Sequence, residues 1–236
     1  MNCINEMGTL LDSNPIKSTN IIPITFMGGT GGNFLSHLLT TAKVNKVIKL
    51  KLSKYGNAHT QFKEVHIPAY SIDTDSFMQV NHLYQMLPKK AESNPPFFVS
   101  CHIRDHLIVA DRFEKSIRIT YEKDDIDILS KVMLGIYALE SLDISTDDTA
   151  TLQNLLRQYV GKYNRFLPYF QNQSTDNILC VRWKDLIQND PDDLILKLSN
   201  FTGINKERFD VTHIVAWRDA TVKGIEEIQA LVNVAK

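Results

Sequence analysis

The sequence predicts an α/β fold with a mainly parallel central sheet. Short apolar runs rich in β-branched and aromatic residues alternate along the chain with longer stretches of helical periodicity, which is the order that parallel strands joined by helices require. The chain has 236 residues, of which 43% are hydrophobic, so it can bury a sizeable core. We expect one three-layer α/β/α domain over residues 20–236, after a loosely ordered, polar leader over residues 1–19.

Five short apolar runs are predicted to be strands, at residues 20–26, 46–52, 96–102, 116–121 and 177–183. Helical patterns lie between and after them, with apolar residues on one side of residues 34–42, 76–87, 127–141, 149–170 and about 222–235.

The two ends of one further helix can be predicted from single residues. Asp190 is a typical N-cap, Pro191 suits the first helical position, and Asp192 favours the positive end of the helix dipole. Gly203 is placed to end the helix.

Composition excludes several classes of protein. A formal net charge of −1 argues against a nucleic-acid partner, because that affinity rests on neutralising many phosphates. Cys3, Cys101 and Cys180 are too few and too scattered for a disulfide framework or a zinc site. No apolar run approaches the ~20 residues that span a bilayer, and the N-terminus lacks the pattern of a signal peptide. We therefore expect a cytoplasmic protein without a membrane span.

A glycine-rich loop follows the first predicted strand. Gly28, Gly29, Gly31 and Gly32 surround Thr30 and lead into the helical pattern. Such a loop holds an anion because its backbone N–H groups converge and the helix offers its positive end. The stretch from residue 13 to residue 63 contains no Asp or Glu and seven lysines, which predicts a locally positive field around the loop.

Two common nucleotide-binding loops fit poorly. In a Walker A register, Met27, Asn33 and Phe34 stand at the first-glycine, lysine and hydroxyl positions, so the magnesium-binding hydroxyl is missing. In a dinucleotide fingerprint, Phe34 replaces the third glycine and no acid follows to bind the ribose. A divergent kinase remains an alternative.

The order of these parts resembles the sulfotransferases that use 3′-phosphoadenosine 5′-phosphosulfate (PAPS), which are a metal-independent branch of the P-loop fold. Residues 176–204 are similar to the family's Arg-Tyr-Glu-Asp-Leu-type motif and the proline-started helix after it, with Trp183 for Tyr and Lys184 for Glu. The resemblance implies a P-loop sulfotransferase-like fold, with Trp183 near the cofactor. It also implies that the 5′-phosphosulfate binds to Gly28, Gly29, Thr30, Gly31, Gly32, Asn33 and Phe34.

Three more segments extend the resemblance. Residues 96–107 are similar to the segment whose strand-end histidine acts on the acceptor, which implies His102 as general base; His37 and His106 are weaker candidates. Residues 116–134 are similar to the segment that binds the 3′-phosphate, which implies Ser130 and, in place of a missing arginine, Lys123. The late basic segment that closes over the cofactor would contain Trp217, Arg218, Lys223 and Gly224.

One departure from the family is serious. The family keeps a lysine or arginine within the loop to neutralise the leaving oxygen, and here Gly29 occupies that place. The candidates to replace it are Arg104, Arg182, Arg218 and Lys223. The resemblance implies transfer from PAPS to a small-molecule or glycan acceptor without a metal; the alternative is a non-catalytic nucleotide-binding or interaction protein on a degenerate P-loop fold.

Overall fold

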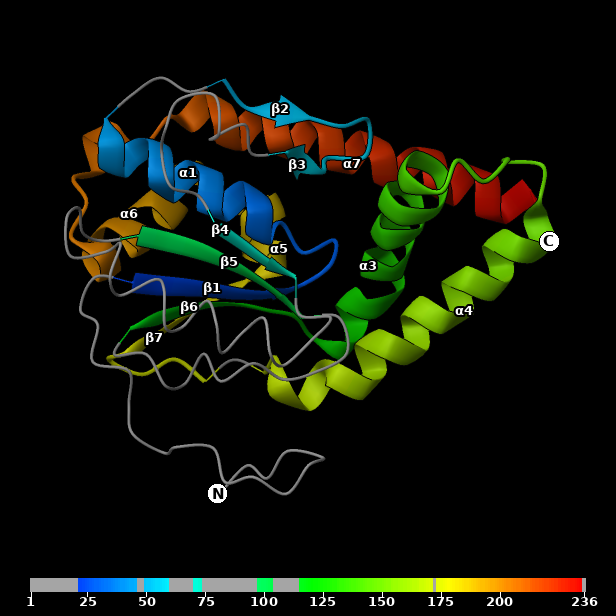
Figure 1. Cartoon of the computed structure of the whole chain (residues 1–236), viewed down its shortest axis with the longest axis horizontal. Coiled ribbons are helices and arrows are strands. Elements are labelled where there is room, and N and C mark those ends of the chain that lie inside the picture. The colour runs from blue at the N-terminus through cyan, green and yellow to red at the C-terminus, as the bar shows by residue number, and fades with distance from the viewer. Residues whose placement is uncertain are drawn as a thin grey trace.

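The computed structural model of the protein describes residues 21–45, 49–59, 70–73, 97–103, 115–171 and 173–234. At its centre lies a five-stranded parallel sheet with the order β4-β5-β1-β6-β7 (Figure 1). Its strands are β1 (Ile21–Met27), β4 (Tyr70–Asp73), β5 (Phe97–Ile103), β6 (Ser116–Thr120) and β7 (Ile178–Arg182). The predicted α/β fold with a parallel sheet is confirmed, and the predicted leader over residues 1–19 lies outside the described residues.

The α-helices of the described chain are α1 (Gly32–Val44), α3 (Ile126–Met133), α4 (Thr149–Phe166), α5 (Trp183–Gln188), α6 (Pro191–Thr202) and α7 (Val211–Val234). A π-helical segment, η4 (Leu134–Ser141), continues α3. Short 3-10 turns are η3 (Lys123–Asp125), η5 (Leu167–Tyr169) and η6 (Lys206–Arg208). Helices α1, α5 and α6 lie against one face of the sheet with α7 outside α1, whereas α3 and α4 lie beyond the carboxyl ends of the strands (Figure 1).

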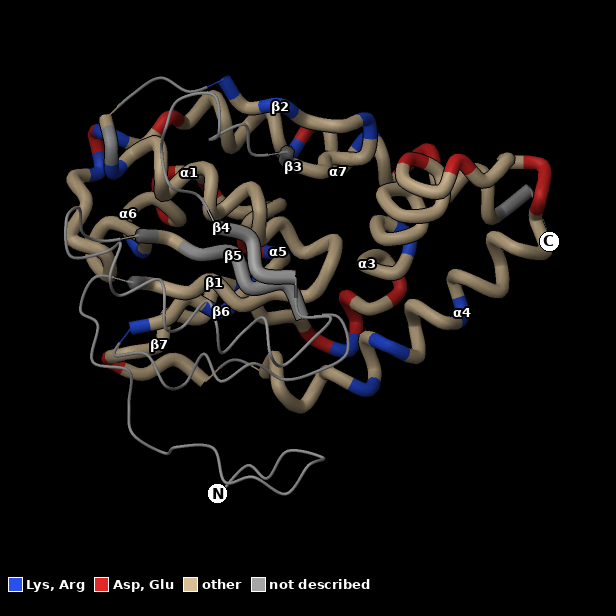
Figure 2. The backbone as a smooth tube through the Cα atoms, in the orientation of Figure 1, with Lys and Arg blue, Asp and Glu red and all other residues tan. Residues whose placement is uncertain are grey.

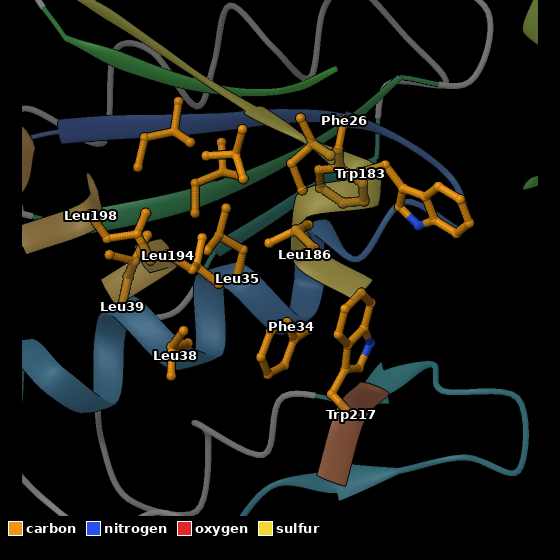
Figure 3. Packing of buried hydrophobic residues seen from close by; sticks show 14 of the residues in the cluster. Phe26, Phe34, Leu35, Leu38, Leu39, Trp183, Leu186, Leu194, Leu198 and Trp217 are labelled. Carbon is orange, nitrogen blue, oxygen red and sulfur yellow. The ribbon is translucent and has the colours of Figure 1, made fainter. Parts of the chain in front are cut away.

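The core forms where β1 meets α1. Residues 22–27 of β1 are all buried, as in a central parallel strand that is covered on both faces. Ile22, Ile24 and Phe26 share one of these faces because side chains alternate along a strand. Leucines from α1, α5 and α6 meet that face (Figure 3). Burial of each such leucine contributes about 1.5–3 kcal/mol, so this packing holds the start of α1 at a fixed place above the end of β1.

The helix predicted after Asp190 is confirmed at both ends. The Asp190 side chain accepts from the N–H of Asp192 at 2.9 Å, Pro191 is the first helical residue, and Gly203 has a left-handed backbone with φ of 73°. The strands predicted at residues 20–26, 96–102, 116–121 and 177–183 are β1, β5, β6 and β7.

One strand prediction was wrong, and one strand of the structure was not predicted. Of the predicted strand over residues 46–52, the structure describes residues 49–52, and within them it has only β2 (Lys51–Leu52), which pairs antiparallel with β3 (Ala58–His59) in a separate ribbon. Lys49 and Lys51 are exposed there, so the run is a surface segment and not a buried parallel strand. The edge strand β4 was not predicted, and the helix predicted over residues 76–87 lies outside the described residues.

Helix α7 begins earlier than the predicted helix at residues 222–235. Asp210 accepts from the backbone N–H and the hydroxyl of Thr212, which caps the first turn. Ile214, Trp217 and Thr221 then recur at helical spacing and are buried. The predicted late basic segment is therefore part of a regular helix.

Candidate functional site

The glycine loop joins the carboxyl end of β1 to the start of α1. Gly29 and Gly31 have φ of 81° and 84°, in the left-handed region that glycine adopts at little cost. Thr30 folds back between them, and its hydroxyl donates to the carbonyl of Met27 at 2.7 Å. Parallel α/β sheets bind ligands at this edge, off the carboxyl ends of the strands.

Two glycines of the loop are required by packing. A Cβ at Gly31 would lie 2.6 Å from the Trp217 ring, and a Cβ at Gly32 would overlap the ring of Phe26. The backbone of the loop thus touches aromatic rings on both sides, and any side chain here would move the start of α1 away from the sheet.

The N-terminus of α1 has donors without an internal acceptor. The first N–H groups of a helix have no carbonyl one turn before them. No side chain caps this end, and its first turn contains no acid that could neutralise the helix dipole. Residues 21–42 contain no charged side chain, and this part of the tube is tan in Figure 2. The loop is therefore suited to an anion that binds through backbone donors.

A small pocket with a cavity volume of about 40 Å³, here called the loop pocket, lies over these donors. Among the described residues that line it, none is charged; they are Phe26, Gly29, Gly31, Gly32, Asn33, Phe34, Tyr55, Gly56, Asn57, Ala58, Val132, Ile136, Trp217 and Thr221. The pocket brings together four distant parts of the chain, namely the loop with the start of α1, the turn between β2 and β3, the continuous helix α3–η4, and α7.

Among the described lysines of the acid-free stretch, none lines the loop pocket. Lys43 lies in the last turn of α1, at the far end of this 13-residue helix from the loop. The ammonium of Lys54, next to the pocket residue Tyr55 in the sequence, pairs with Glu227 at 2.7 Å. Lys17, Lys46 and Lys63 lie outside the described residues.

Trp217 closes one side of the loop pocket. Its indole is stacked on Phe34 in α1, and both rings are buried (Figure 3). The indole Nε1–H donates to the carbonyl of Gly56 at 3.0 Å, which ties α7 to the turn between β2 and β3. Phe34, a predicted cofactor-binding residue, and Trp217, from the predicted late basic segment, therefore meet at the loop, where their side chains act in packing.

Tyr163 contacts the loop from the other side and was not predicted. Its hydroxyl donates to the carbonyl of Gly28, and the hydroxyl of Tyr121 donates to the backbone carbonyl of Tyr163 at 2.9 Å. Burial raises the pKa of Tyr163 well above its ordinary value, so the hydroxyl keeps its proton. Its position in the last turn of α4 gave no local signal, because the contact joins residues far apart in sequence.

A second pocket, here called the strand-end pocket, lies where β6 and β7 end. It has a cavity volume of about 300 Å³ and is lined by Thr120, Tyr121, Glu122, Lys123, Leu167, Gln171 and Arg182. The Arg182 guanidinium pairs with Glu122 at 2.6 Å, whereas Lys123 is exposed. The structure thus places the predicted Lys123 and the motif residue Arg182 at one site.

Ser130 does not reach that site. It is fully buried in α3, and its hydroxyl donates to the carbonyl of Ile126 at 2.7 Å. This is the usual backbone bond of a serine within a helix, so the predicted contact of Ser130 with a 3′-phosphate does not fit this position.

The residues of the 182–186 motif after Arg182 are structural. Trp183 is buried in the core, and Lys184 pairs at 3.0 Å with the fully buried carboxylate of Asp125. The Arg218 guanidinium donates to the carbonyl of Leu186 at 2.6 Å and to that of Asp185, which caps the end of α5. Neither Trp183 nor Arg218 is among the described residues that line the two pockets, so their role as cofactor ligands stays a prediction.

The two late residues also lie elsewhere than predicted. Lys223 is exposed on α7 and lines neither pocket. Gly224 is buried against the turn between β2 and β3, where a Cβ would lie 3.0 Å from the Cα of Tyr55. Of the four candidate replacements for the loop cation, Arg182, Arg218 and Lys223 thus lie outside the loop pocket, and Arg104 is outside the described residues.

His102 lies next to the end of β5, the neighbour of β1. In the sheet it pairs with Phe26 of β1 on one side and with Asp73 of β4 on the other. This register puts residue 102 beside the start of the glycine loop. His37 is instead buried in α1 with its ring 5.2 Å from that of His213, and His106 lies outside the described residues.

Two other kinds of feature are absent from the described residues, a cluster of metal-ligating side chains and a helix that could span a membrane. Within that part of the chain, no three His, Cys, Asp or Glu residues gather as a metal site would require. None of its helices combines the length and the apolar character needed to cross a bilayer.

Comparisons with known proteins give one similar structure to report. No protein-family model matches the sequence, and no curated protein matches it. Among solved structures, the chain is similar to one described as the sulfotransferase domain from the curacin biosynthetic pathway. The two share 15% identity over 80% of this chain and 76% of that one, with a TM-score of 0.38. Because this similarity is low, the fold assignment rests on the order and direction of the strands in the sheet of this chain.

Proposed function

We propose that the protein is a sulfotransferase that moves a sulfuryl group from PAPS to an acceptor hydroxyl or amine. One observation carries the proposal. An uncapped glycine loop lies at the carboxyl end of the central strand β1, with residue 102 beside it on β5 and the strand-end pocket beside it on β6 and β7. PAPS has two anionic ends and a transferable group, and this arrangement offers a place for each of them.

The loop would bind the 5′-phosphosulfate through backbone donors. The orphan N–H groups at the start of α1 and the dipole of that helix favour a compact anion. The loop offers neither a lysine nor a magnesium-binding hydroxyl, which disfavours transfer from a nucleoside triphosphate.

The strand-end pocket would bind the 3′-phosphate. Lys123 is an exposed cation at its rim, and Arg182 already holds its guanidinium toward the pocket by pairing with Glu122. A phosphate here would gain charge-assisted hydrogen bonds from both side chains.

Transfer then needs a base and stabilisation of the leaving group. The acceptor oxygen or nitrogen forms a bond to sulfur as the bond from sulfur to the 5′-phosphate oxygen breaks, and His102 takes the acceptor proton. The products are the sulfated acceptor and adenosine 3′,5′-bisphosphate. In-line positioning and the loop amides supply the rate enhancement, since negative charge grows on the phosphate oxygen that the loop holds.

The test uses labelled PAPS with a panel of hydroxylated and amine acceptors, including glycans. We expect transfer by the wild-type protein and a loss of about 10²-fold or more in His102→Ala, as is typical for removal of a general base. His213→Asn, on α7 and outside both pockets, is the matched control and keeps its activity. Equal activity of His102→Ala and wild type removes His102 from the mechanism.

A second candidate is a non-catalytic nucleotide-binding or interaction protein on the same fold. It is favoured by the loop pocket, whose described lining contains no cation to neutralise a leaving oxygen. This candidate predicts binding of adenosine 3′,5′-bisphosphate, or of no nucleotide, without transfer to any acceptor.

A further inference from the structure

The place of the missing loop cation is occupied by another residue. A Cβ at Gly29 would lie 3.1 Å from the hydroxyl oxygen of Tyr163 and 3.2 Å from Cγ of Met133. Gly29 also has φ of 81°, which a residue with a side chain adopts only under strain. A lysine or arginine at position 29 is therefore disfavoured both by the backbone conformation of Gly29 and by its contact with Tyr163.

The Tyr163 hydroxyl fixes the direction of one peptide group. It donates to the carbonyl of Gly28, and no other tyrosine in the described residues bonds to the loop. In a planar trans peptide, the C=O of one residue and the N–H of the next point in opposite directions. Because the Gly28 carbonyl is turned toward Tyr163, the N–H of Gly29 is turned away from it. Gly29 lines the loop pocket, and its N–H donates to no backbone carbonyl of the described residues, so we infer that this donor can bind a ligand.

Tyr163 is itself held rigidly. Its side chain is buried, its ring packs edge-on against Tyr121 with centroids 5.4 Å apart, and its backbone carbonyl accepts from the Tyr121 hydroxyl. A buried donor of this kind keeps its partner in place more firmly than a solvent-exposed side chain, because its alternatives are few.

We propose that Tyr163 is a positioning residue that turns the Gly28–Gly29 peptide so that the Gly29 N–H binds the 5′-phosphate in place of the absent loop cation. This inference rests on the proposed function. It predicts that removal of one hydroxyl, remote from the reacting atoms, weakens recognition of one particular phosphate.

The test compares Tyr163→Phe with Tyr159→Phe by calorimetric titration of adenosine 3′,5′-bisphosphate and of adenosine 3′-phosphate. Tyr159 lies one turn earlier in α4, and its buried hydroxyl has no hydrogen-bond partner among the described residues. We expect Tyr163→Phe to weaken binding of the bisphosphate about tenfold, the usual effect of one hydrogen bond to a charged group. Its affinity for adenosine 3′-phosphate should change less than about twofold. Tyr159→Phe changes neither affinity. An equal loss for both ligands would indicate a general structural role and overturn the proposal.

A second measurement needs no nucleotide. The ¹⁵N shift of the Gly29 amide depends on the hydrogen bond to the carbonyl of its own peptide group, so it moves in Tyr163→Phe and stays in Tyr159→Phe. An unmoved Gly29 signal in Tyr163→Phe refutes the positioning role. If the wild-type protein binds neither nucleotide, the proposed function fails, and the Gly29 signal alone decides whether Tyr163 orients the loop.

Discussion

The indole of Trp217 lies on the phenyl ring of Phe34, with centroids 4.5 Å apart and planes 4° from parallel. Phe34 belongs to the first turn of α1 and Trp217 to α7, so this stack joins the glycine loop to the last helix of the described chain. The same indole holds the carbonyl of Gly56. One side chain thus sets the distance between three walls of the loop pocket.

Substitution of Trp217 separates these two contacts. Trp217→Phe keeps a ring against Phe34 and loses the bond to Gly56, and we expect it to lower the free energy of unfolding by about 1–3 kcal/mol. Trp217→Ala also opens a cavity and costs about 3–5 kcal/mol. Urea unfolding measures both. Val215→Ala on the exposed side of α7 is the control, with a change within about 0.5 kcal/mol; a similar small effect of Trp217→Ala would contradict the stacking account.

Gly31→Ala tests the backbone of the loop, and Gly161→Ala in α4 is its control. Gly31→Ala introduces a Cβ at positive φ and against the Trp217 ring, so we expect a loss of at least about 1–2 kcal/mol. Gly161→Ala, in α4 with no atom within 4 Å of the new Cβ, should gain about 0.5–1 kcal/mol from helix propensity. Thermal unfolding of the two variants measures the difference, and a neutral Gly31→Ala would show that the loop can rearrange.

The burial of three tyrosine hydroxyls makes the free energy of unfolding depend on pH in the alkaline range. Burial raises the pKa of Tyr121 and Tyr163, and burial together with Tyr137 raises the pKa of Tyr159 to about 12. Because the folded pKa values lie above the unfolded value of about 10, this contribution is fully present below pH 10 and is lost as the pH rises through the folded values.

Absorbance of phenolate at alkaline pH checks this prediction. Of the eight tyrosines, Tyr121, Tyr159 and Tyr163 should ionise only as the protein unfolds. The fall in the free energy of unfolding above pH 10 should be shallower in Tyr159→Phe. Ionisation of all eight near pH 10 in a protein that stays folded would show that these hydroxyls are accessible.

Lys123 provides a test of the strand-end pocket alone. If this pocket binds the 3′-phosphate, Lys123→Ala weakens binding of adenosine 3′,5′-bisphosphate about fivefold at low salt, a loss of about 1 kcal/mol. The affinity for adenosine 5′-phosphate stays unchanged. The difference shrinks as salt screens the exposed charge. Lys206→Ala, an exposed lysine in η6, is the control. An equal loss of affinity for both nucleotides would show that the 3′-phosphate binds at another site.

The sequence predicted those parts of the fold that are determined locally. Periodicity located β1 and α1, and the cap at Asp190 with the stop at Gly203 located α6. The lysine-rich run at 46–52 was misread because its alternation of Lys and apolar residues suits a surface ribbon as well as a strand. Charge counted along the sequence also misled, since Lys43 lies at the far end of α1 from the loop.

The candidate site was only partly predictable. The loop follows from its glycines, but Tyr163 meets Gly28 through tertiary packing that no local pattern encodes. Likewise, Ser130 and Arg218 were assigned to a ligand, whereas their polar atoms bond to the backbones of Ile126 and Leu186. Which of several polar residues in a helix faces a ligand depends on the rotation of that helix, and the sequence alone does not determine it.

The central claim is that the glycine loop holds a nucleotide's 5′-phosphate without a metal or a lysine. Its most direct measurement is the thermal unfolding of the protein with adenosine 3′,5′-bisphosphate, in parallel with ATP and magnesium, because a ligand stabilises only the folded state that binds it. We predict a rise in Tm that increases with adenosine 3′,5′-bisphosphate and that Gly31→Ala abolishes, with little or no rise for ATP and magnesium. Stabilisation by ATP and magnesium alone would contradict the account.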